Sequence, residues 1–395
     1  MQINIIGGGA AGFFTAINVK ELIPKAEVTI LERGHGVLRK VAVSGGGRCN
    51  VTNTFEGIGD LSEVYPRGHR LMRKLLQEFS PEDIFKWFED RKVRLTAQSD
   101  HCVFPASQNS QTIIDCFESE ARRLGVKIKT DVKEIDLDAM LNDGIIAVVC
   151  TGGITSHSMS SWLGVPEEDI VPPVPSLFSL SINDPALRKL MGTVVAETTV
   201  SLAGTKHKAK GDLLITHWGV SGPATLRLSS SAARTLSECK YQGTLIVNWL
   251  GASEEAAASE LKEIISASPQ KALLNAHPAK LTGRLWEHII AHGLGDAKEK
   301  RWCELGKKEV NKLIQELTAA PYPISGRAPF KDEFVTAGGI SLTSVNSKTM
   351  ESKRRSGLYF AGEVMDIDGV TGGFNFTAAW CTAMAAARSI AKNQE

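Results

Sequence analysis

The feature that most constrains this chain is a glycine-rich turn between its first predicted strand and its first predicted helix. QINII (Gln2–Ile6) is a short β-branched run, Gly7-x-Gly9-x-x-Gly12 follows at once, and a helical pattern then continues to about Leu22. In such a turn the first glycine permits the tight bend, the second lets backbone amides approach a pyrophosphate, and the third lets the helix pack on the sheet. The turn therefore predicts a Rossmann-like dinucleotide-binding unit, with the anion held by amides at the helix N-terminus.

A carboxylate follows the second predicted strand, where such a unit binds a ribose. That strand is Glu27–Leu31, and Glu32 lies twenty positions after Gly12. A carboxylate at this point accepts a hydrogen bond from a ribose 2′-hydroxyl and would repel the 2′-phosphate of NADP. A chance cluster of glycines in a packed turn is the alternative. The order of strand, turn, helix, strand and acid favours dinucleotide binding, but it does not separate FAD from NAD.

The C-terminal segment GLYFAGEVMDIDGVTGGFN (residues 357–375) favours FAD. An apolar strand precedes Gly362 and Glu363, Asp366 and Asp368 follow, and a second glycine turn leads into an alanine-rich helix. FAD needs contacts along its ribityl chain and isoalloxazine as well as at its pyrophosphate. A helix N-terminus here would also stabilise negative charge on a reduced flavin. The alternative is an acidic surface turn.

A second glycine loop, SGGGRCNVTN, begins at Ser44, a dozen residues after Glu32. Three consecutive glycines suit a backbone that passes close to a flat or bulky group. We expect Lys40, Arg48 and Asn50 to line the flavin side, with Arg48 supplying positive charge to the pyrophosphate or the reduced ring. The alternative is a turn that packs against the C-terminal GGFN turn.

Periodicity predicts an α/β fold that is interrupted by an insertion. VPPVPSLFSLSI (residues 171–182) suggests a domain crossing, a period of two dominates from there to about residue 250, and helical patterns follow to about residue 319. We therefore expect a discontinuous Rossmann-like FAD-binding domain over 1–175 and 331–395, an inserted β-barrel-like domain over 176–252 and a helical subdomain over 253–330.

Composition excludes several classes of protein. Lys plus Arg number 45 and Asp plus Glu 44, so no global field attracts nucleic acid or an anionic membrane. Seven cysteines with no Cys-x-x-Cys pair form neither a disulfide framework nor a zinc signature. No apolar run reaches the length of a membrane span, and the N-terminus opens directly into the first motif. We expect a cytoplasmic protein with no membrane or nucleic-acid partner and no metal, and the oligomeric state stays open.

Three further features have a plain structural interpretation. His288 and His292 resemble half of a zinc motif but lack a third ligand, so a packed or surface pair is favoured. His217 lies in a turn of the predicted barrel and is either structural or on the substrate side. Cys49 has no partner cysteine nearby in sequence, so a disulfide-reductase mechanism has no support. The sequence assigns no catalytic acid or base.

Segments along nearly the whole chain resemble the BaiN/RdsA-type (YhiN-like) family of NAD(P)/FAD-dependent oxidoreductases. They are IIGGGAAG, the pair Glu32-Arg33, RKVAVSGGGRCNVTN, VFPAS, GDLLITHWGVSGPA and the C-terminal stretch from VTAGGISL to GGFN. The resemblance implies an FAD-binding Rossmann-like domain with an inserted β-barrel and a helical subdomain. The residues expected to contact the cofactor are Gly7, Gly9, Ala10, Ala11, Gly12, Glu32, Arg33, Lys40, Ser44, Gly46, Arg48, Cys49, Asn50, Thr151, Gly152, Gly362, Glu363, Asp368, Gly373, Phe374 and Asn375.

One segment departs from the family pattern. After a Thr-Gly-Gly turn, relatives carry a Ser-Tyr-Pro stretch and a Gly-Ser-Thr-Gly turn, whereas Thr151–Gly153 continues here as ITSHSMSSWLG, with neither. Because this loop is expected near the cofactor, substrate access or specificity is expected to differ from that of the relatives.

These observations predict an FAD-dependent oxidoreductase that moves a hydride or an electron pair to or from a small organic substrate. NAD(P)H is the expected electron partner, as a transient co-substrate, because no second fingerprint announces a dedicated nicotinamide domain. The resemblance favours chemistry at a carbon–carbon bond. Three alternatives stay open: an amine or amino-ketone oxidase that uses O₂, an RNA-modifying flavoprotein, and a flavin-bearing redox sensor.

Overall fold

The computed structural model describes residues 1–154, 160, 163–297, 299–328 and 335–393. The chain forms two compact units. Unit 1 comprises Met1–Pro175 and Lys331–Glu395, and unit 2 comprises Ser176–Phe330. Within the described ranges, no helix has the length and apolar character needed to cross a bilayer.

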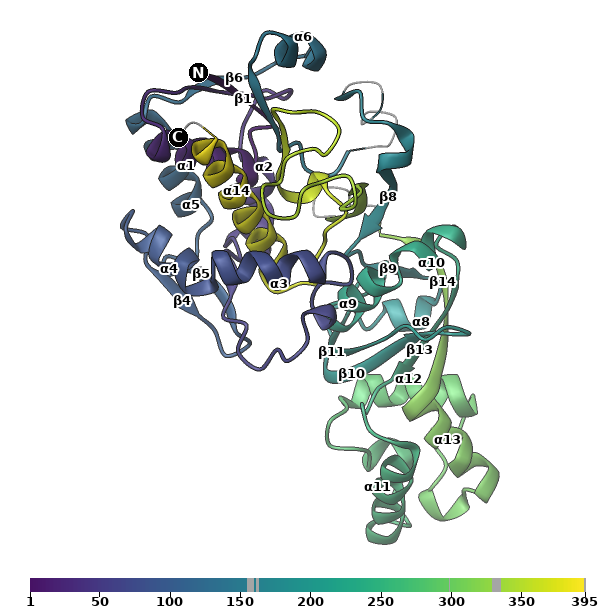
Figure 1. Cartoon of the computed structure of the whole chain (residues 1–395). Coiled ribbons are helices and arrows are strands. Elements are labelled where there is room, and N and C mark those ends of the chain that lie inside the picture. The colour runs from purple at the N-terminus through teal and green to yellow at the C-terminus, as the bar shows by residue number, and fades with distance from the viewer. Residues whose placement is uncertain (155–159, 161–162, 298, 329–334, 394–395) are drawn as a thin grey trace. The chain divides into compact units, whose positions relative to one another are not determined.

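Unit 1 is built on a five-stranded parallel sheet (Figure 1). Its strands, in spatial order, are β16 (Leu358–Phe360), β7 (Ile146–Val149), β1 (Gln2–Ile6), β2 (Glu27–Leu31) and β6 (Lys127–Lys129). Ile3 of the central strand pairs with Val28 on one side and Ile146 on the other. The apolar runs that predicted β1 and β2 are buried because helices cover the central strands of a parallel sheet.

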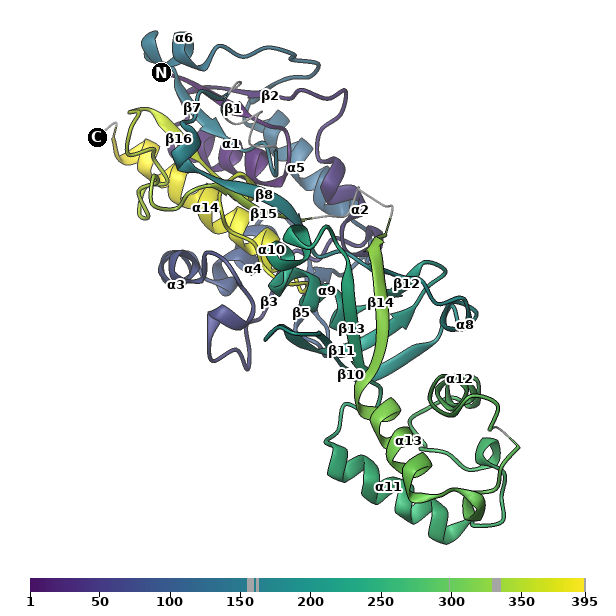
Figure 2. The same cartoon turned by 90° about the vertical axis from the view of Figure 1, so that its right-hand side faces the viewer.

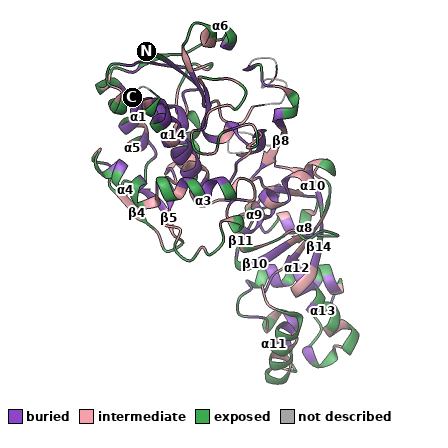
Figure 3. Cartoon of the chain, viewed as in Figure 1, coloured by how far each residue is buried: buried purple, intermediate pink, exposed green. Residues whose placement is uncertain are grey.

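Seven helices of unit 1 are described, and two of them, α1 and α14, pack closely against each other. They are α1 (Ala10–Leu22), α2 (Arg39–Gly47), α3 (His69–Glu78), α4 (Pro81–Glu89), α5 (Gln111–Arg123), α6 (Leu137–Asn142) and α14 (Phe374–Lys392). The alanine-rich α14 lies beside α1, and both are mostly buried (Figure 3). Phe14 packs between Trp87 and Trp380, with ring centroids 4.5 and 5.1 Å away. This aromatic group holds α1, α4 and α14 together.

Two smaller sheets and three short 3₁₀ turns complete unit 1. The sheets are β3 (Thr52–Asn53) with β5 (Cys102–Pro105) and β4 (Leu95–Ala97), and β8 (Ile170–Ser176) with β15 (Val335–Ile340). The turns are η1 (Leu61–Glu63), η2 (Glu167–Asp169) and η5 (Gly362–Val364).

Unit 2 contains a closed six-stranded barrel and two groups of helices (Figure 2). The strands, in order around the barrel, are β10 (Val194–Leu202), β11 (Lys208–Ile215), β12 (Gly219–Ser221), β9 (Leu180–Ile182), β14 (Ala320–Arg327) and β13 (Gly243–Asn248). Short helices α8 (Pro185–Arg188), α9 (Pro223–Ser231) and α10 (Ala233–Glu238) occur between strands. Between β13 and β14 come α11 (Glu254–Ala267), η3 (Leu273–Asn275), α12 (Gly283–Leu294), η4 (Trp302–Glu304) and α13 (Lys307–Ala319).

The predicted α/β fold class with an inserted barrel is confirmed, but one strand lies where we expected helix. β14 falls inside the range 253–330 that we predicted as a helical subdomain, and it closes the barrel between β13 and β9. Its two prolines hide the strand pattern, although its residues alternate between buried and exposed. The Pro323 carbonyl oxygen accepts from the Asn183 amide at 3.4 Å, on the β9 side. Backbone N–H and C=O of one residue point to the same side of an antiparallel strand, so this proline costs no hydrogen bond to β13.

Candidate functional site

The fingerprint glycines occupy three different environments at the N-terminus of α1. Gly7 has φ +112°, and a Cβ there would lie 2.5 Å from the Cys150 carbonyl oxygen. A Cβ on Gly12 would lie 2.0 Å from the Gly7 carbonyl oxygen, whereas a Cβ on Gly9 would meet no atom within 4 Å. The first and third glycines are therefore required by the fold, and the second opens the space in which an anion can approach the helix amides.

Glu32 lies directly after β2 and faces the same turn. One carboxylate oxygen accepts from the Gly8 amide at 2.7 Å, and the other accepts from the Gly34 amide at 2.7 Å. These two bonds hold the carboxylate beside the glycine turn, where it can accept from a ribose hydroxyl. Arg33, the next residue, is exposed.

Glu363 contacts residues from three parts of unit 1. One of its carboxylate oxygens accepts from the Lys40 ammonium at 2.8 Å, and the other accepts from the Thr336 amide at 2.8 Å. A Cβ on Gly152 would lie 3.4 Å from Glu363, and a Cβ on Gly362 would lie 2.8 Å from the Ala11 methyl group. The turns that follow β1, β7 and β16 therefore converge at the carboxyl ends of neighbouring parallel strands, where α/β folds bind their ligands.

The second glycine loop turns sharply at the end of α2. Ser44 has extended backbone angles, and Gly45, Gly46 and Gly47 all have positive φ, between +56° and +82°. A Cβ on Gly46 or Gly47 would meet no atom within 4 Å. This stretch of backbone presents open space, and its three left-handed residues explain why glycine occurs three times. The Arg48 guanidinium lies over the Phe104 ring, 4.2 Å from its centroid.

The end of the same loop is tied to the C-terminal glycine turn. The Asn50 side-chain amide is oriented so that its oxygen accepts from the Gly373 backbone amide at 3.1 Å. Its nitrogen then donates to the Val103 and Thr52 carbonyl oxygens. The Asn53 amide donates to the Gly372 carbonyl at 3.0 Å. The sequence left open whether SGGGRCNVTN lines the cofactor or packs on the GGFN turn. Its asparagines pack on that turn, while Gly46 and Gly47 face open space.

Three predicted contact residues pack around the start of α14, and two of them are buried. The Asp368 carboxylate is fully buried and forms a two-pronged ion pair with Arg67. Phe374 is 5 % exposed and packs edge-on against Tyr65 and Phe55. The Asn375 side chain accepts from the Gly369 amide at 2.8 Å and donates to its carbonyl at 2.9 Å.

Sequence analysis missed the partners of these residues. The Tyr65 hydroxyl donates to the Phe374 carbonyl at 2.8 Å, and Arg67 neutralises Asp368. The sequence signal for them is weak: Tyr-Pro-Arg-Gly at 65–68 is an unremarkable turn, because its partners lie about 300 positions away. Thr336, which donates to Glu363, lies within VTAGGISL without a motif of its own.

The cysteine and histidine candidates have structural surroundings. Burial raises the pKa of the Cys49 thiol to about 12, and the Ser44 hydroxyl lowers it by a smaller amount. A thiol of this kind is a poor nucleophile at neutral pH. His288 donates to or accepts from the Tyr322 hydroxyl at 3.1 Å, and His292 pairs with Glu316 at 2.7 Å. In the described part of the chain, no group of three His, Cys, Asp or Glu residues can hold a metal.

The residues around α1 fit FAD. The open face of Gly9 suits a diphosphate, Glu32 suits a ribose, and Glu363 lies with Gly152 beside the turn that would carry the ribityl chain. The divergent loop after Thr151-Gly152-Gly153 falls largely on residues 155–159 and 161–162, which lie outside the described residues.

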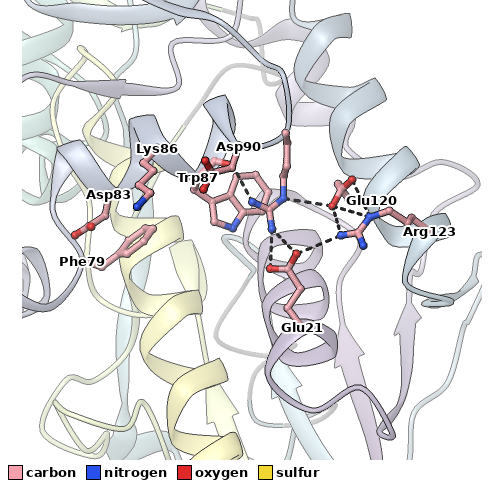
Figure 4. A pocket seen from close by; sticks show the side chains of 9 residues that line it. Glu21, Phe79, Asp83, Lys86, Trp87, Asp90, Glu120 and Arg123 are labelled. Atoms are coloured by element: carbon pink, nitrogen blue, oxygen red, sulfur yellow. Dashed lines mark hydrogen bonds and ion pairs between the residues drawn. The ribbon is translucent and has the colours of Figure 1, made fainter.

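A pocket of about 490 Å³ lies at the opposite end of α1 (Figure 4). It is lined by Glu21, Phe79, Asp83, Lys86, Trp87, Asp90, Arg91, Glu120 and Arg123. Arg91 lies over the Trp87 ring at 3.7 Å and bonds both carboxylate oxygens of Glu21 at 2.6 Å. At 1.5 Å per residue, the 13 residues of α1 place this network about 20 Å from the glycine turn. It is an ion-pair network that joins α1, α4 and α5, away from the cofactor residues.

Comparison with known proteins places the whole chain among flavoproteins. The family model described as the HI0933-like protein Rossmann domain matches residues 1–389. A ribosomal RNA dihydrouridine synthase of Haemophilus influenzae is 27% identical, over 98% of this chain and 98% of the relative. A 3-dehydro-bile acid delta(4,6)-reductase of Clostridium scindens is 28% identical, over 99% of each. A 3-ketosteroid delta1-dehydrogenase structure from Sterolibacterium denitrificans is 10% identical with a TM-score of 0.49, over 99% of each chain.

Proposed function

Because the chain belongs to the HI0933-like Rossmann-domain family, we propose that it is an FAD-dependent reductase of a conjugated carbon–carbon double bond, with NAD(P)H as electron donor. That it is an oxidoreductase with an FAD-type Rossmann fold follows from the family and its members. The substrate class and the nicotinamide are the proposed part.

The observation that carries the proposal is the convergence of the α1 turn, Glu32 and Glu363, with Lys40 of α2 bound to Glu363. FAD, when bound, supplies the two-electron chemistry. Helix amides at Gly9 would hold the diphosphate, Glu32 would bind the adenosine ribose, and Glu363 would orient the ribityl chain. The left-handed glycines at 45–47 let backbone approach the ring system closely.

The names of the relatives support reduction of a double bond. A delta(4,6)-reductase acts on carbon–carbon double bonds, and forming dihydrouridine from uridine saturates one double bond that is conjugated to a carbonyl. The two reactions share the saturation of a carbon–carbon double bond that is conjugated to an electron-withdrawing carbonyl, although their substrates differ greatly in size. This common chemistry leads us to propose a small conjugated carbonyl compound or acid as substrate.

Anaerobic reduction of the bound flavin tests the proposal. We expect NADH or NADPH to bleach the flavin absorbance of the purified holoprotein, and a conjugated carbonyl substrate to restore it. Failure of both nicotinamides, with dithionite still reducing the flavin, would contradict the proposal. Peroxide release on an amine panel without nicotinamide would instead identify an amine oxidase.

An RNA substrate is the second candidate, because two relatives are named as ribosomal RNA dihydrouridine synthases. The chain itself has a formal net charge of only +1, so it has no general attraction for RNA. A titration of ribosomal RNA at low salt decides between the two. Saturable binding together with dihydrouridine formation would favour the RNA substrate.

A further inference from the structure

Arg48 makes three contacts at the end of the second glycine loop. Its Nε donates to the Gly45 carbonyl at 3.2 Å, and one terminal nitrogen donates to the Gln108 side-chain oxygen at 3.4 Å. The guanidinium plane lies over Phe104, with Cζ 4.2 Å from the ring centroid. The Gln108 side-chain oxygen also accepts from the Gln98 side-chain amide at 3.4 Å. These contacts orient the Arg48 guanidinium, and its remaining N–H donors stay available.

The charge of Arg48 has no acidic partner in the described part of the chain. Two other cations of the site segments are neutralised: Lys40 pairs with Glu363, and Arg67 pairs with Asp368. The contacts of Arg48 are instead with a carbonyl, an amide oxygen and an aromatic ring. None of these carries a negative charge, so the guanidinium keeps its full attraction for an anion.

Two of the residues that place Arg48 have left-handed backbone angles. Cys49, the next residue, has φ +61°, and Gln108, its side-chain partner, has φ +53°. Non-glycine residues rarely adopt these left-handed angles, and such strain persists where the surrounding structure imposes it, often at functional sites. Beside them, Gly46 and Gly47 leave open space. The fold thus holds a cation at the edge of an open stretch of backbone.

We propose that Arg48 anchors an anionic group of the substrate, a carboxylate or a phosphate, that is carried by the molecule reduced at the flavin. This inference rests on the proposed function and names its substrate class. A planar guanidinium with free N–H donors matches the two oxygens of either anion. The anchor makes and breaks no covalent bond; it orients the substrate.

The diphosphate of FAD is a less suitable occupant for Arg48. That diphosphate is expected at the open face of Gly9, where helix amides point at it. The contacts of Arg48 run to Gly45, Phe104 and Gln108, and none of these residues lies on α1. The cation whose contacts do lead toward the strand ends is Lys40, through Glu363.

Ligand titration of the oxidised holoprotein tests the anchor. The probes are crotonate and cinnamate, their neutral amides, and inorganic phosphate, and the readout is the flavin difference spectrum. We expect the wild type to bind at least one of these anions saturably. R48M should raise the Kd for that anion at least tenfold, and R48K should raise it less. The amides should bind R48M and wild type equally. R122M, which removes an exposed arginine near the C-terminal end of α5, should match the wild type.

The outcomes separate the anchor from the proposed function. Equal anion affinity in wild type and R48M, or no saturable signal with crotonate, cinnamate or phosphate in the wild type, overturns the anchor. A carboxylate signal without a phosphate signal assigns the anion as a carboxylate, and the reverse assigns a phosphate. Bleaching by NAD(P)H, measured on the same samples, reports on the function alone, so either idea can fail while the other stands. Flavin content of R48M, measured in parallel, shows whether the variant still holds FAD.

Discussion

Gly9 and Gly12 belong to one turn but are required for different reasons. Gly9 has extended backbone angles (φ −91°, ψ −167°) that alanine can adopt, and its missing side chain faces open space. Gly12 is buried, with the Gly7 carbonyl oxygen 2.0 Å from the place of a Cβ. One glycine is therefore kept for a ligand and the other for the fold.

We predict that G9A and G12A fail in different assays. G9A should leave the free energy of unfolding of the apoprotein within about 1 kcal/mol of wild type. It should also raise the Kd for FAD at least tenfold. G12A should destabilise the apoprotein by roughly 1–3 kcal/mol or more, because the methyl group must displace backbone. Urea unfolding and FAD titration measure the two effects. Tight FAD binding by G9A would contradict the assignment of the diphosphate to its open face.

Cys49 differs in reactivity from the exposed cysteines, Cys239 and Cys303. Because burial raises its pKa to about 12, Cys49 is almost entirely in the thiol form at pH 8. We predict that iodoacetamide alkylates Cys239 and Cys303 of the native protein within minutes and leaves Cys49 unmodified until the protein is denatured. Peptide mass spectrometry locates the labels. Rapid labelling of Cys49 in the native protein would contradict this prediction and would support a redox role for its thiol.

Among the secondary-structure elements, those with a clear local periodicity were predicted correctly, whereas a strand that is identified only by its pairing partners was missed. The predicted strands Gln2–Ile6 and Glu27–Leu31 and the helix that ends at Leu22 have the predicted bounds. Each carries its own periodicity and is closed by glycine or proline. The strand β14 was missed because its prolines resemble a linker, and only its pairing with β13 and β9 identifies it.

The helices α12 and α13 are joined by an ion pair that depends on pH. His292 on α12 contacts Glu316 on α13, which is 9% exposed, and this hydrogen bond raises the pKa of His292. Asp184 raises the pKa further, while burial opposes it. The neighbouring His288 has a lowered pKa, because it is buried against Tyr322.

A raised histidine pKa stabilises the fold at low pH. The contribution of His292 is complete below the pKa of the unfolded chain, about 6.5, and is lost as pH rises through the higher folded pKa. We predict that H292Q lowers the free energy of unfolding by roughly 1–3 kcal/mol near pH 6 and by less near pH 9. Urea unfolding across this range measures the difference. E316Q should show the same trend, and a pH-independent loss in both variants would exclude the ion pair as its cause.

At the scale of the whole molecule, the predicted cofactor residues all belong to unit 1. A single apolar cluster with members on the parallel sheet, α1 and α14 is made only of unit 1 residues. A ligand that binds the folded form stabilises the unit that holds it. The stability of unit 1 should therefore depend on FAD, and that of the barrel and its helices should not.

We predict two calorimetric transitions, of which FAD shifts one. Raising free FAD to a hundred times its Kd should stabilise unit 1 by about 2.7 kcal/mol, so that its transition moves to higher temperature. The second transition should stay fixed, and G9A should abolish the shift. If both transitions move together with FAD, the units unfold cooperatively and the prediction is wrong.

The sequence by itself determined the fold class, the nucleotide turn and the acid after the second strand. These are local features, in which each residue acts on neighbours within about twenty positions. Tertiary structure alone decided which residues meet. Lys40 and Glu363 are 323 positions apart, and Asn53 and Gly372 are 319 apart, so no local pattern relates them. It also decided that Asp368 and Phe374 are buried supports of α14, because burial depends on what packs against a side chain and not on its own chemistry.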